Sequence, residues 1–407
     1  MNPRFLIITL LLAVLSACSK PVGTSVKNSL DQAVTDLVVK LSSPELIQAA
    51  SNTPEFKLMD GKTEVPYQLL KEGDQINAIL VQLSFAANEE KTIHLQSGSP
   101  AGFPKKTHAE LSIKEGGEWK WVTKKNGNEQ YEYEGGTWKS VDALHVDAKH
   151  TDHSFDIRYE GPGWESDKIG YRFYLDWRNA VDIFGKKTAS MVLPQVGLDG
   201  FDSYHEMSDW GADIMKVGDA LGIGTIAHWA KGKANRIAKT DSLFSEVTQD
   251  GVLESSIATR YSGWEFDGGK TTLTSTLTIR AGSYLTKCEL RSSNPIDSLA
   301  TGIIKMPDTE TVQSANESGD WAYYGTFGVQ SLNKDKLGLF VFYRKSQLEK
   351  LTEDPLNHVI VLKPENQQLS YYFGGAWELD SSKTDSKEKL LAFLNQQLAL
   401  LNAGMIN

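Results

Sequence analysis

Cysteine is almost absent from this chain, which has only Cys18 and Cys288 among its 407 residues. A small fold held together by disulfides is therefore excluded, because such scaffolds are dense in cysteine. Cys288 lies in an alternating run of polar and apolar residues, where a buried and unreactive thiol is expected.

Several sequence motifs of common enzyme classes are also missing. The chain has no Walker A pattern and no G-x-G-x-x-G, so a phosphate-binding loop is not supported. It has no H-E-x-x-H and no G-x-S-x-G, which excludes zincin proteases and serine hydrolases with a nucleophile elbow. The net charge is -10 and the pI is about 5.4. An acidic chain without a basic, aromatic-rich array is not expected to bind nucleic acid.

The first eighteen residues contain an apolar run, 5–15, behind Arg4. The run is too short for a membrane-spanning helix and has the length of a signal-peptide core. Leu-Ser-Ala-Cys at 15–18 then matches the bacterial lipobox, which predicts cleavage before Cys18 and attachment of a lipid to its thiol. Ser19, where Asp would favour retention at the inner membrane, favours the outer one. We expect a lipoprotein of the cell envelope, anchored to the outer membrane through Cys18.

The rest of the chain is predicted to be mainly β. Short alternating runs separated by turn residues over 19–98 predict a small N-terminal β-sandwich. A stretch rich in Gly, Pro and Ser, 97–108, predicts a linker. Residues 108–407 then predict a large antiparallel β-sandwich of a dozen or more strands, with a galactose-mutarotase-like sandwich as the candidate fold and as the catalytic domain.

Particular elements of this large sandwich can be placed from the sequence. Asn126-Gly127 predicts a hairpin with an aromatic strand on either side, and 141–148 and 154–159 are predicted to continue as strands. Residues 388–402 predict a helix that begins after Asp385 or Ser386, carries a stripe of leucines and ends before Gly404. We expect this helix to brace the sheet.

The stretch 158–187 is rich in chemically active side chains. Four apolar residues alternate in it with four polar ones, which predicts a strand with one packed face and one polar face. The apolar residues are Tyr171, Phe173, Leu175 and Trp177, and the polar residues are Arg172, Tyr174, Asp176 and Arg178. Side chains two apart on a strand are roughly 6.5 Å apart, so the polar row has about the length of a disaccharide. The alternative is a solvated sheet face on which opposite charges pair.

A second rich stretch covers 195–233. It holds His205 in a polar loop, and Gly222 and Gly224 predict a close approach of backbones. His228, between Ala227 and Trp229, is compatible both with a packed core histidine and with a ligand-binding one.

Two runs carry a resemblance to a known family: GPGWESDKIGYRFYLDWRNAVDIFGKK at 161–187 and YHEMSDWGADIMKVGDALGIG at 204–224. They resemble the signature blocks of a bacterial family labelled as a domain of unknown function, found in loci that degrade ulvan, pectin and other uronic-acid polysaccharides. The family is similar to an oligosaccharide dehydratase that acts on ulvan fragments. The resemblance implies removal of water from a non-reducing-end uronic acid, which leaves a 4,5-unsaturated sugar.

The residues can be matched to this chemistry. Elimination takes the proton from C5, beside the carboxylate, and expels the hydroxyl on C4, so the carboxylate needs a cation. Arg172, Arg178 and Lys216 suit that task, and Arg suits it best because its fork meets a carboxylate in two bonds. Tyr174 or His205 is the candidate base, and the other is the candidate acid.

Further residues are candidates for holding the substrate. Lys168 or Lys216 would favour a Tyr174 phenolate, and Trp164 and Trp210 could stack on sugar faces, whereas Trp177 is expected in the core. Asp176 and Asp213 are expected to orient basic groups. The substrate-binding candidates are Arg178, Lys168, Trp164, Glu165, Trp210, Asp176, Asp213 and His228.

Three alternatives remain open. A glycoside hydrolase would need two carboxylates about 5 to 9.5 Å apart, with Glu165 and Asp176 or Asp213 as candidates. A non-catalytic glycan-binding lipoprotein would need only aromatic and polar side chains, and a purely structural lipoprotein would need neither. No motif calls for a cofactor, although Asp167, Asp176, Asp182 and His205 could hold a divalent cation. The expected partner is an acidic oligosaccharide, and the oligomeric state is left open.

Overall fold

The computed structural model describes residues 22–315 and 318–406. The predicted signal peptide and lipid anchor, with Cys18, lie outside these residues. None of the described helices is long and apolar enough to cross a membrane.

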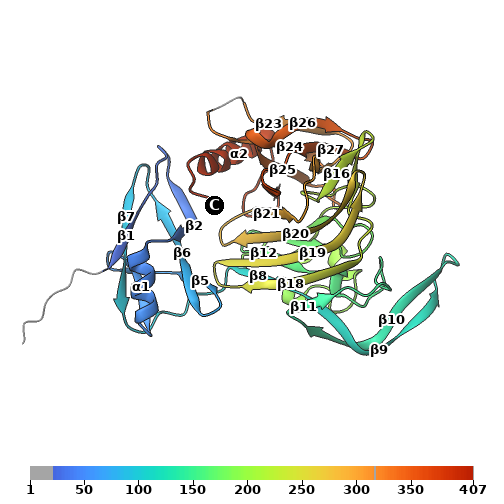
Figure 1. The fold of residues 1–407 in the computed structure, drawn as a ribbon, viewed down its shortest axis with the longest axis horizontal. Coiled ribbons are helices and arrows are strands. Elements are labelled where there is room, and N and C mark those ends of the chain that lie inside the picture. Colours follow the sequence, from blue (N-terminus) through green and yellow to red (C-terminus); the bar gives the residue numbers. More distant parts are fainter. Residues whose placement is uncertain (1–21, 316–317, 407) are drawn as a thin grey trace, which may run out of the picture.

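The N-terminal part is the predicted small β-sandwich, drawn in blue in Figure 1. One sheet has the order β1 (Gly23–Lys27), β7 (Glu90–Ser97), β3 (Phe56–Asp60) and β4 (Thr63–Val65), and the other has the order β2 (Val34–Leu41), β6 (Gln75–Phe85) and β5 (Tyr67–Glu72). Neither β1 nor the helix α1 (Pro44–Asn52) was predicted from the sequence. Ser43 caps the α1 helix, because its hydroxyl accepts a hydrogen bond from the amide of Leu46 at 3.3 Å.

The large sandwich is built on a nine-stranded antiparallel sheet. Its order is β11 (Ala143–His145), β18 (Ser242–Asp250), β19 (Glu254–Phe266), β20 (Gly269–Arg280), β21 (Leu285–Ser292), β28 (Gln368–Trp377), β25 (Lys336–Arg344), β24 (Trp321–Val329) and β23 (Thr309–Gln313). The alternating polar and apolar pattern of β20 places every second side chain in the core.

Two five-stranded sheets form the facing layer. One has the order β15 (Gly211–Asp213), β14 (Val181–Lys186), β13 (Ile169–Phe173), β12 (Gly163–Ser166) and β8 (Thr107–Glu110). The other has the order β17 (Lys233–Arg236), β16 (Ala227–Ala230), β22 (Leu299–Ile304), β27 (Asn357–Leu362) and β26 (Leu348–Glu353). The mainly antiparallel β-sandwich architecture is therefore confirmed.

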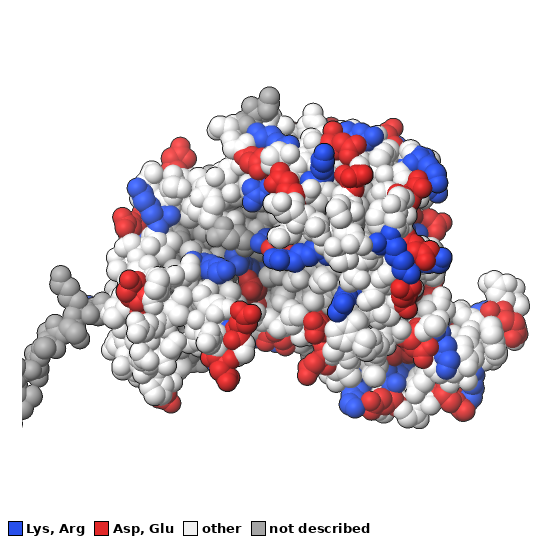
Figure 2. All heavy atoms as spheres, in the orientation of Figure 1, with Lys and Arg blue, Asp and Glu red and all other residues white. Residues whose placement is uncertain are grey.

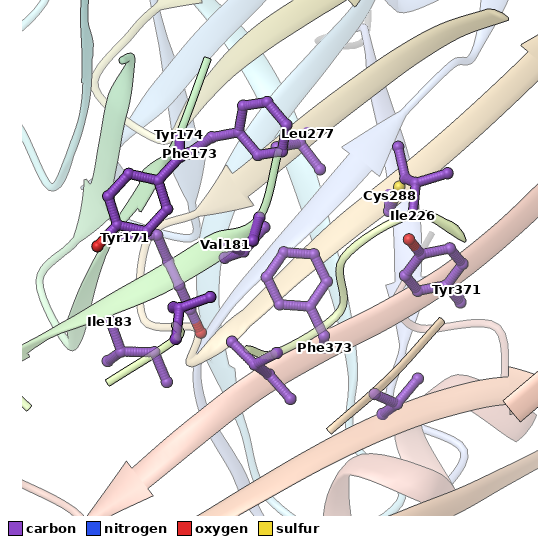
Figure 3. Close-up of a cluster of buried hydrophobic side chains, with 14 of the residues drawn as sticks. Tyr171, Phe173, Tyr174, Val181, Ile183, Ile226, Leu277, Cys288, Tyr371 and Phe373 are labelled. Carbon is purple, nitrogen blue, oxygen red and sulfur yellow. The ribbon is translucent and has the colours of Figure 1, made fainter. Parts of the chain in front are cut away.

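The main core lies between these layers. Figure 3 shows Tyr171, Phe173 and Val181 of the first five-stranded sheet beside Phe373 and Cys288 of the nine-stranded sheet. Cys288 is fully buried, as predicted, and burial raises the pKa of its thiol to about 12. The predicted close approach at the glycines is also confirmed: Gly224 has φ +67°, and a Cβ there would lie 2.3 Å from the ring of Phe373.

The helix α2 (Lys387–Asn402) braces the nine-stranded sheet as predicted. Ser386 caps it by accepting a hydrogen bond from the amide of Lys389, and Leu390, Leu394 and Leu398 pack against Phe340 and Tyr323 of the sheet. Leu400 packs instead into the core of the N-terminal sandwich. The helix therefore contacts both sandwiches.

A two-stranded hairpin, β9 (Ser112–Thr123) and β10 (Glu129–Ser140), projects from the large sandwich (Figure 1). Trp119 pairs with Tyr133 and Trp121 with Tyr131, so the four aromatic rings share one face. The connecting turn, 124–128, has the odd number of residues that this arrangement requires.

Two predicted elements differ from the structure. The strand expected over 154–159 does not form, because Phe155, Tyr159 and Glu160 adopt left-handed backbone conformations with φ between 37° and 72°. The strand in the signature block ends at Phe173, and 174–180 turn back toward β14. Trp177, expected in the core, therefore lies on this turn and is 50% exposed.

Candidate acid–base site

The candidate site is formed where β13, β14 and β15 bring charged side chains together. Arg172 of β13 lies opposite Asp182 of β14 in the antiparallel register, and Phe184 of β14 lies opposite Asp213 of β15. The loop before β12 and the loop containing His205 cover this part of the sheet. Residues that are 41 positions apart in the sequence therefore meet in one buried cluster.

Arg172 is the centre of this cluster and is 3% exposed. Its Nε and Nη2 donate to Asp182 Oδ2 at 3.1 and 2.8 Å, its Nη1 donates to the Tyr204 hydroxyl at 2.8 Å, and its Nη2 also contacts Asp213. Burial, together with the neighbouring Asp213 carboxylate, raises the pKa of Asp182 to about 6. The guanidinium thus has its acceptors within the protein, and its predicted grip on a substrate carboxylate is wrong.

His205 extends this cluster to the surface. Its Nε2 lies 3.2 Å from Asp213 Oδ2, the oxygen that Arg172 also contacts, and its Nδ1 lies 2.6 Å from the carbonyl oxygen of Phe201. The hydrogen bond to Asp213 raises the pKa of His205. Because both ring nitrogens face acceptors, the surroundings favour the imidazolium form. We call Arg172, Asp213 and His205 the Arg172 triad.

A second series of the same residue types lies beside the first. Arg178 contacts Asp176, and its Nη2 is 2.9 Å from Asp152 Oδ1. That same Asp152 oxygen is 2.8 Å from His153 Nδ1. Partial burial opposes ionisation of Asp152, but the contacts with His153 and Arg178 lower its pKa to about 2. We call Arg178, Asp152 and His153 the Arg178 triad.

His153 differs from His205 in one nitrogen. Its Nε2 forms no hydrogen bond or ion pair with any residue in the described ranges, and its side chain is 38% exposed. The contact with Asp152 raises the pKa of His153 and fixes Nδ1 toward the carboxylate. An imidazole held by a carboxylate on one side and open on the other is the usual arrangement of a general acid or base.

Glu160 contacts residues of both the Arg172 triad and the Arg178 triad. Its Oε1 is 2.9 Å from Arg178 Nη2 and accepts a hydrogen bond from the backbone amide of His153 at 2.9 Å. Its Oε2 is 3.9 Å from Arg172 Nη1. Glu160 therefore fixes the position of His153 relative to the buried arginines.

The backbone around His153 is strained. His153, Phe155, Tyr159 and Glu160 have φ values of 57°, 59°, 37° and 72°, although none is glycine. The loop is held by the buried His150, whose Nδ1 is 2.8 Å from Asp156, and by the hairpin, since Gln130 Nε2 donates to the carbonyl oxygen of Asp152 at 2.7 Å. Strain of this kind is found mainly at functional sites, where surrounding contacts enforce it.

The two histidines both pack near the Phe201 ring. The ring centroids of His153 and Phe201 are 4.3 Å apart, and those of Phe201 and His205 are 6.3 Å apart. Below them is a narrow pocket lined by Trp138, Phe155 and Tyr204, with about 20 Å³ of space. That is room for roughly one water molecule.

Tyr174, a predicted base, is part of the floor of the site. It is 4% exposed, and its hydroxyl donates to Asp182 Oδ2 at 2.6 Å. Burial raises its pKa well above the usual value for tyrosine. The prediction of a Tyr174 phenolate is therefore wrong, and its ring instead packs against the Arg178 guanidinium at 3.7 Å.

Other predicted site residues lie elsewhere. Trp164 is fully buried, with its Nε1 bonded to Thr286, so its predicted sugar contact is wrong. Glu165 is fully buried against Lys186 and accepts hydrogen bonds from the amides of Val192 and Leu193, so it cannot be half of a hydrolase pair.

The remaining candidates are dispersed. Trp210 is half-buried against Phe184, and His228 packs on Phe266, where burial lowers its pKa. Lys216 is exposed and has no hydrogen bond or ion pair with a described residue. Lys168 contacts Asp167 at 3.2 Å and lines a different cavity.

The residues predicted to hold a divalent cation do not fit one. Asp167 bonds the amide of Gly282, and the Arg172 guanidinium occupies the space beside Asp182. Asp152, His153 and Glu160 bring ligand atoms within 4.8 Å of one another, but Arg178 already lies 2.9 Å from both carboxylates. A guanidinium in that position takes the place that a metal ion would need.

Comparison with known proteins places the chain in a family. The family model described as "Domain of unknown function (DUF4861)" matches residues 26–404. The chain belongs to this family. The predicted membership in a family of unknown function is confirmed, and both signature blocks lie within the matched residues. Among curated proteins, none matches.

Two solved structures show a distant likeness. An alpha-mannosidase from Enterococcus faecalis V583 aligns with a TM-score of 0.42 at 11% identity, over 93% of this chain and 44% of its own. A protein in the glycosyl hydrolase family 38 from Enterococcus faecalis aligns with a TM-score of 0.41 at 11% identity, over 93% of this chain and 46% of its own. This chain spans less than half the length of either protein.

Four residues of the site were not predicted from the sequence: Asp152, His153, Glu160 and Tyr204. A signal for the first two was present, because 147–156, DAKHTDHSFD, holds two of the eight histidines beside three aspartates. Because a strand was predicted over 154–159, this cluster of histidines and aspartates was not interpreted as part of a site.

Proposed function

We propose that the chain is a carbohydrate-active enzyme of the carbon–oxygen lyase type, which eliminates water from the non-reducing-end uronic acid of an oligosaccharide. The observation that carries this proposal is the open Nε2 of His153, whose ring is held by Asp152 and Arg178 and lies beside the half-buried ring of Phe201. Elimination beside a carboxylate needs one well-placed base, and this imidazole is the best placed in the cluster.

The reaction balances with His153 as the group that moves the proton. Neutral Nε2 takes the proton from C5, the electron pair forms the C4–C5 double bond, and the C4–O bond breaks. The imidazolium formed can return that proton to the departing oxygen on the same face, which leaves as water. Asp152 stabilises the imidazolium between the two steps.

In this proposal His205 attracts the substrate carboxylate through its positive charge and not through a hydrogen bond, because both of its ring nitrogens already face acceptors in the protein. The arginines are already paired with Asp182, Asp213, Asp152 and Glu160, so they act by fixing the carboxylates behind the histidines. His205 is 39% exposed, and its surroundings favour a positive charge. In this proposal the half-buried ring of Phe201, which lies near both histidines and is stacked on Phe155, is the aromatic side chain that contacts the sugar ring.

The test is to incubate the purified chain with saturated uronic-acid oligosaccharides and follow their mass. The expected product has lost one water, about 18 Da, and gains the ultraviolet absorbance of an unsaturated uronate. Shortened chains without this loss would favour a hydrolase instead. Binding without any change in mass would favour the glycan-binding alternative.

We also propose that Cys18 anchors the mature chain to the outer membrane of the cell envelope. The support is the lipobox at 15–18. Replacement of Cys18 with Ser is expected to move the protein from the membrane fraction to the aqueous fraction. Retention of the Cys18→Ser chain in the membrane fraction would contradict the anchor.

A further inference from the structure

A cavity separate from the acid–base site lies where the N-terminal sandwich meets the large one. It is lined by β2, by the turn between β20 and β21, and by α2, and Figure 2 shows basic side chains gathered in the hollow between the two parts. Its volume of about 320 Å³ is within the range of ligand pockets, roughly 300 to 1,000 Å³. Lys168 lies here, at the end of β13 opposite to the acid–base site.

Three basic side chains and one acidic one line this cavity: Lys168, Arg280 and Lys389, with Asp36. Each base has a carboxylate partner that does not line the cavity: Asp167 at 3.2 Å, Glu254 at 2.7 Å and Asp385 at 2.7 Å, respectively. The partners hold the bases in place and limit the net charge. Such a site suits a ligand with one carboxylate better than a highly charged anion.

Arg280 is the most informative of the three. Its Nε donates to Glu254, and its side chain is only 16% exposed. Its two terminal nitrogens donate no hydrogen bond to any residue within the described part of the chain. A guanidinium that is fixed at Nε and open at both Nη atoms presents the fork that binds a carboxylate in two bonds.

Amide and hydroxyl groups complete the lining. Gln396 and Gln397 of α2 are half-buried, and neither side-chain amide is hydrogen-bonded to another described residue. Ser381, Ser382 and Thr384 add hydroxyl groups to the lining. The hydroxyls are already hydrogen-bonded to Tyr284, to Trp377 or to one another, whereas the glutamine amides are open. Open amides beside a cation are groups that recognise sugar hydroxyls next to a carboxylate.

We infer that this cavity is a second binding site for an acidic saccharide, in which Arg280 and Lys168 hold a uronate carboxylate and α2 binds the sugar hydroxyls. The choice of uronate as the acidic sugar rests on the proposed function, whereas the binding itself does not depend on turnover. The site would hold a second saccharide molecule, or a distant part of a long one, away from the histidines.

The test is a calorimetric titration of the His153→Gln chain with a saturated galacturonate hexasaccharide. Two binding events per chain are expected, and adding Arg280→Gln or Lys168→Gln is expected to weaken one of them about tenfold or more. Arg260→Gln, an exposed position on β19 outside the cavity, is the matched control and should leave both unchanged. Lys168→Gln leaves the Arg280–Glu254 pair intact, so it guards against loss of folding in the Arg280 variant.

Three results would overturn the inference. The first is a single binding event that neither variant changes. The second is an affinity for a neutral hexasaccharide equal to the affinity for the galacturonate hexasaccharide. The third is that inorganic sulfate displaces the hexasaccharide as well as free galacturonate does at the same concentration, which would indicate a simple anion site. Failure of the proposed function looks different. The wild-type chain would then leave the hexasaccharide mass unchanged, while the event sensitive to Arg280 remained.

Discussion

The Arg172 triad and the Arg178 triad contain the same residue types in the same order, Arg, Asp and His, and Glu160 contacts both. In one, both imidazole nitrogens of His205 are turned toward acceptors in the protein. In the other, one nitrogen of His153 is open. The residue types alone therefore do not decide the role of a histidine. The role of a histidine depends on how many of its ring nitrogens are left without a partner in the protein.

The difference predicts that His153 carries the largest effect on turnover. The His153→Gln variant keeps a polar side chain of similar reach but loses the proton-transfer group, so kcat should fall by about 10²- to 10⁴-fold. The His145→Gln variant, at an exposed histidine on β11, is the control and should retain full activity. A His153→Gln chain with a normal melting temperature and more than a tenth of wild-type kcat would remove His153 from the mechanism.

His205 should affect binding more than chemistry. The His205→Gln variant loses the positive charge that faces the substrate carboxylate, so we expect KM to rise about tenfold with kcat nearly unchanged. Steady-state kinetics on a uronate substrate measure both. If kcat instead fell as far as in the His153 variant, the two histidines would share the proton transfer and the contrast between them would be lost.

Tyr174 should have the smallest effect. The Tyr174→Phe variant keeps the ring against Arg178 but removes the hydrogen bond to Asp182. We expect kcat to stay within about threefold of wild type, and the free energy of unfolding to fall by roughly 1–2 kcal/mol. Denaturant titration measures the second quantity. Loss of activity in a stable Tyr174→Phe chain would restore tyrosine as the base.

Much of the fold could be predicted because its signals are local. The leucine spacing and the Ser386 cap of α2, and the alternation of β20, depend on residues near one another in the sequence. The alternation over 171–178 predicted a longer strand than the one that forms, because β13 ends at Phe173, and Tyr174, Asp176 and Arg178 lie on the turn that follows it. Arg172, Tyr174 and His205 are linked through Asp182 and Asp213, whereas Lys216 forms no hydrogen bond or ion pair with a described residue.

The rest of the site depends on features that a pattern of residue types does not encode. The left-handed backbone at His153 and Glu160 follows from contacts with the hairpin and with Arg178, far away in the sequence. Whether Glu165 faces solvent or Lys186 depends on which strands become neighbours. The carboxylates that pair with Arg172 and Arg178 likewise come from three separate segments.

The pH dependence of kcat/KM, compared with the titration of the His153 imidazole by NMR, tests the central claim most directly. Because the contact with Asp152 raises the pKa of His153, its neutral, basic form is present only above the ordinary value of about 6.5. We predict that kcat/KM rises with pH through a pKa above that value, that the NMR titration of His153 gives the same pKa, and that the rise disappears in His153→Gln. A rising limb that persists unchanged in the variant, or that does not coincide with the His153 titration, would contradict the assignment of His153 as the base.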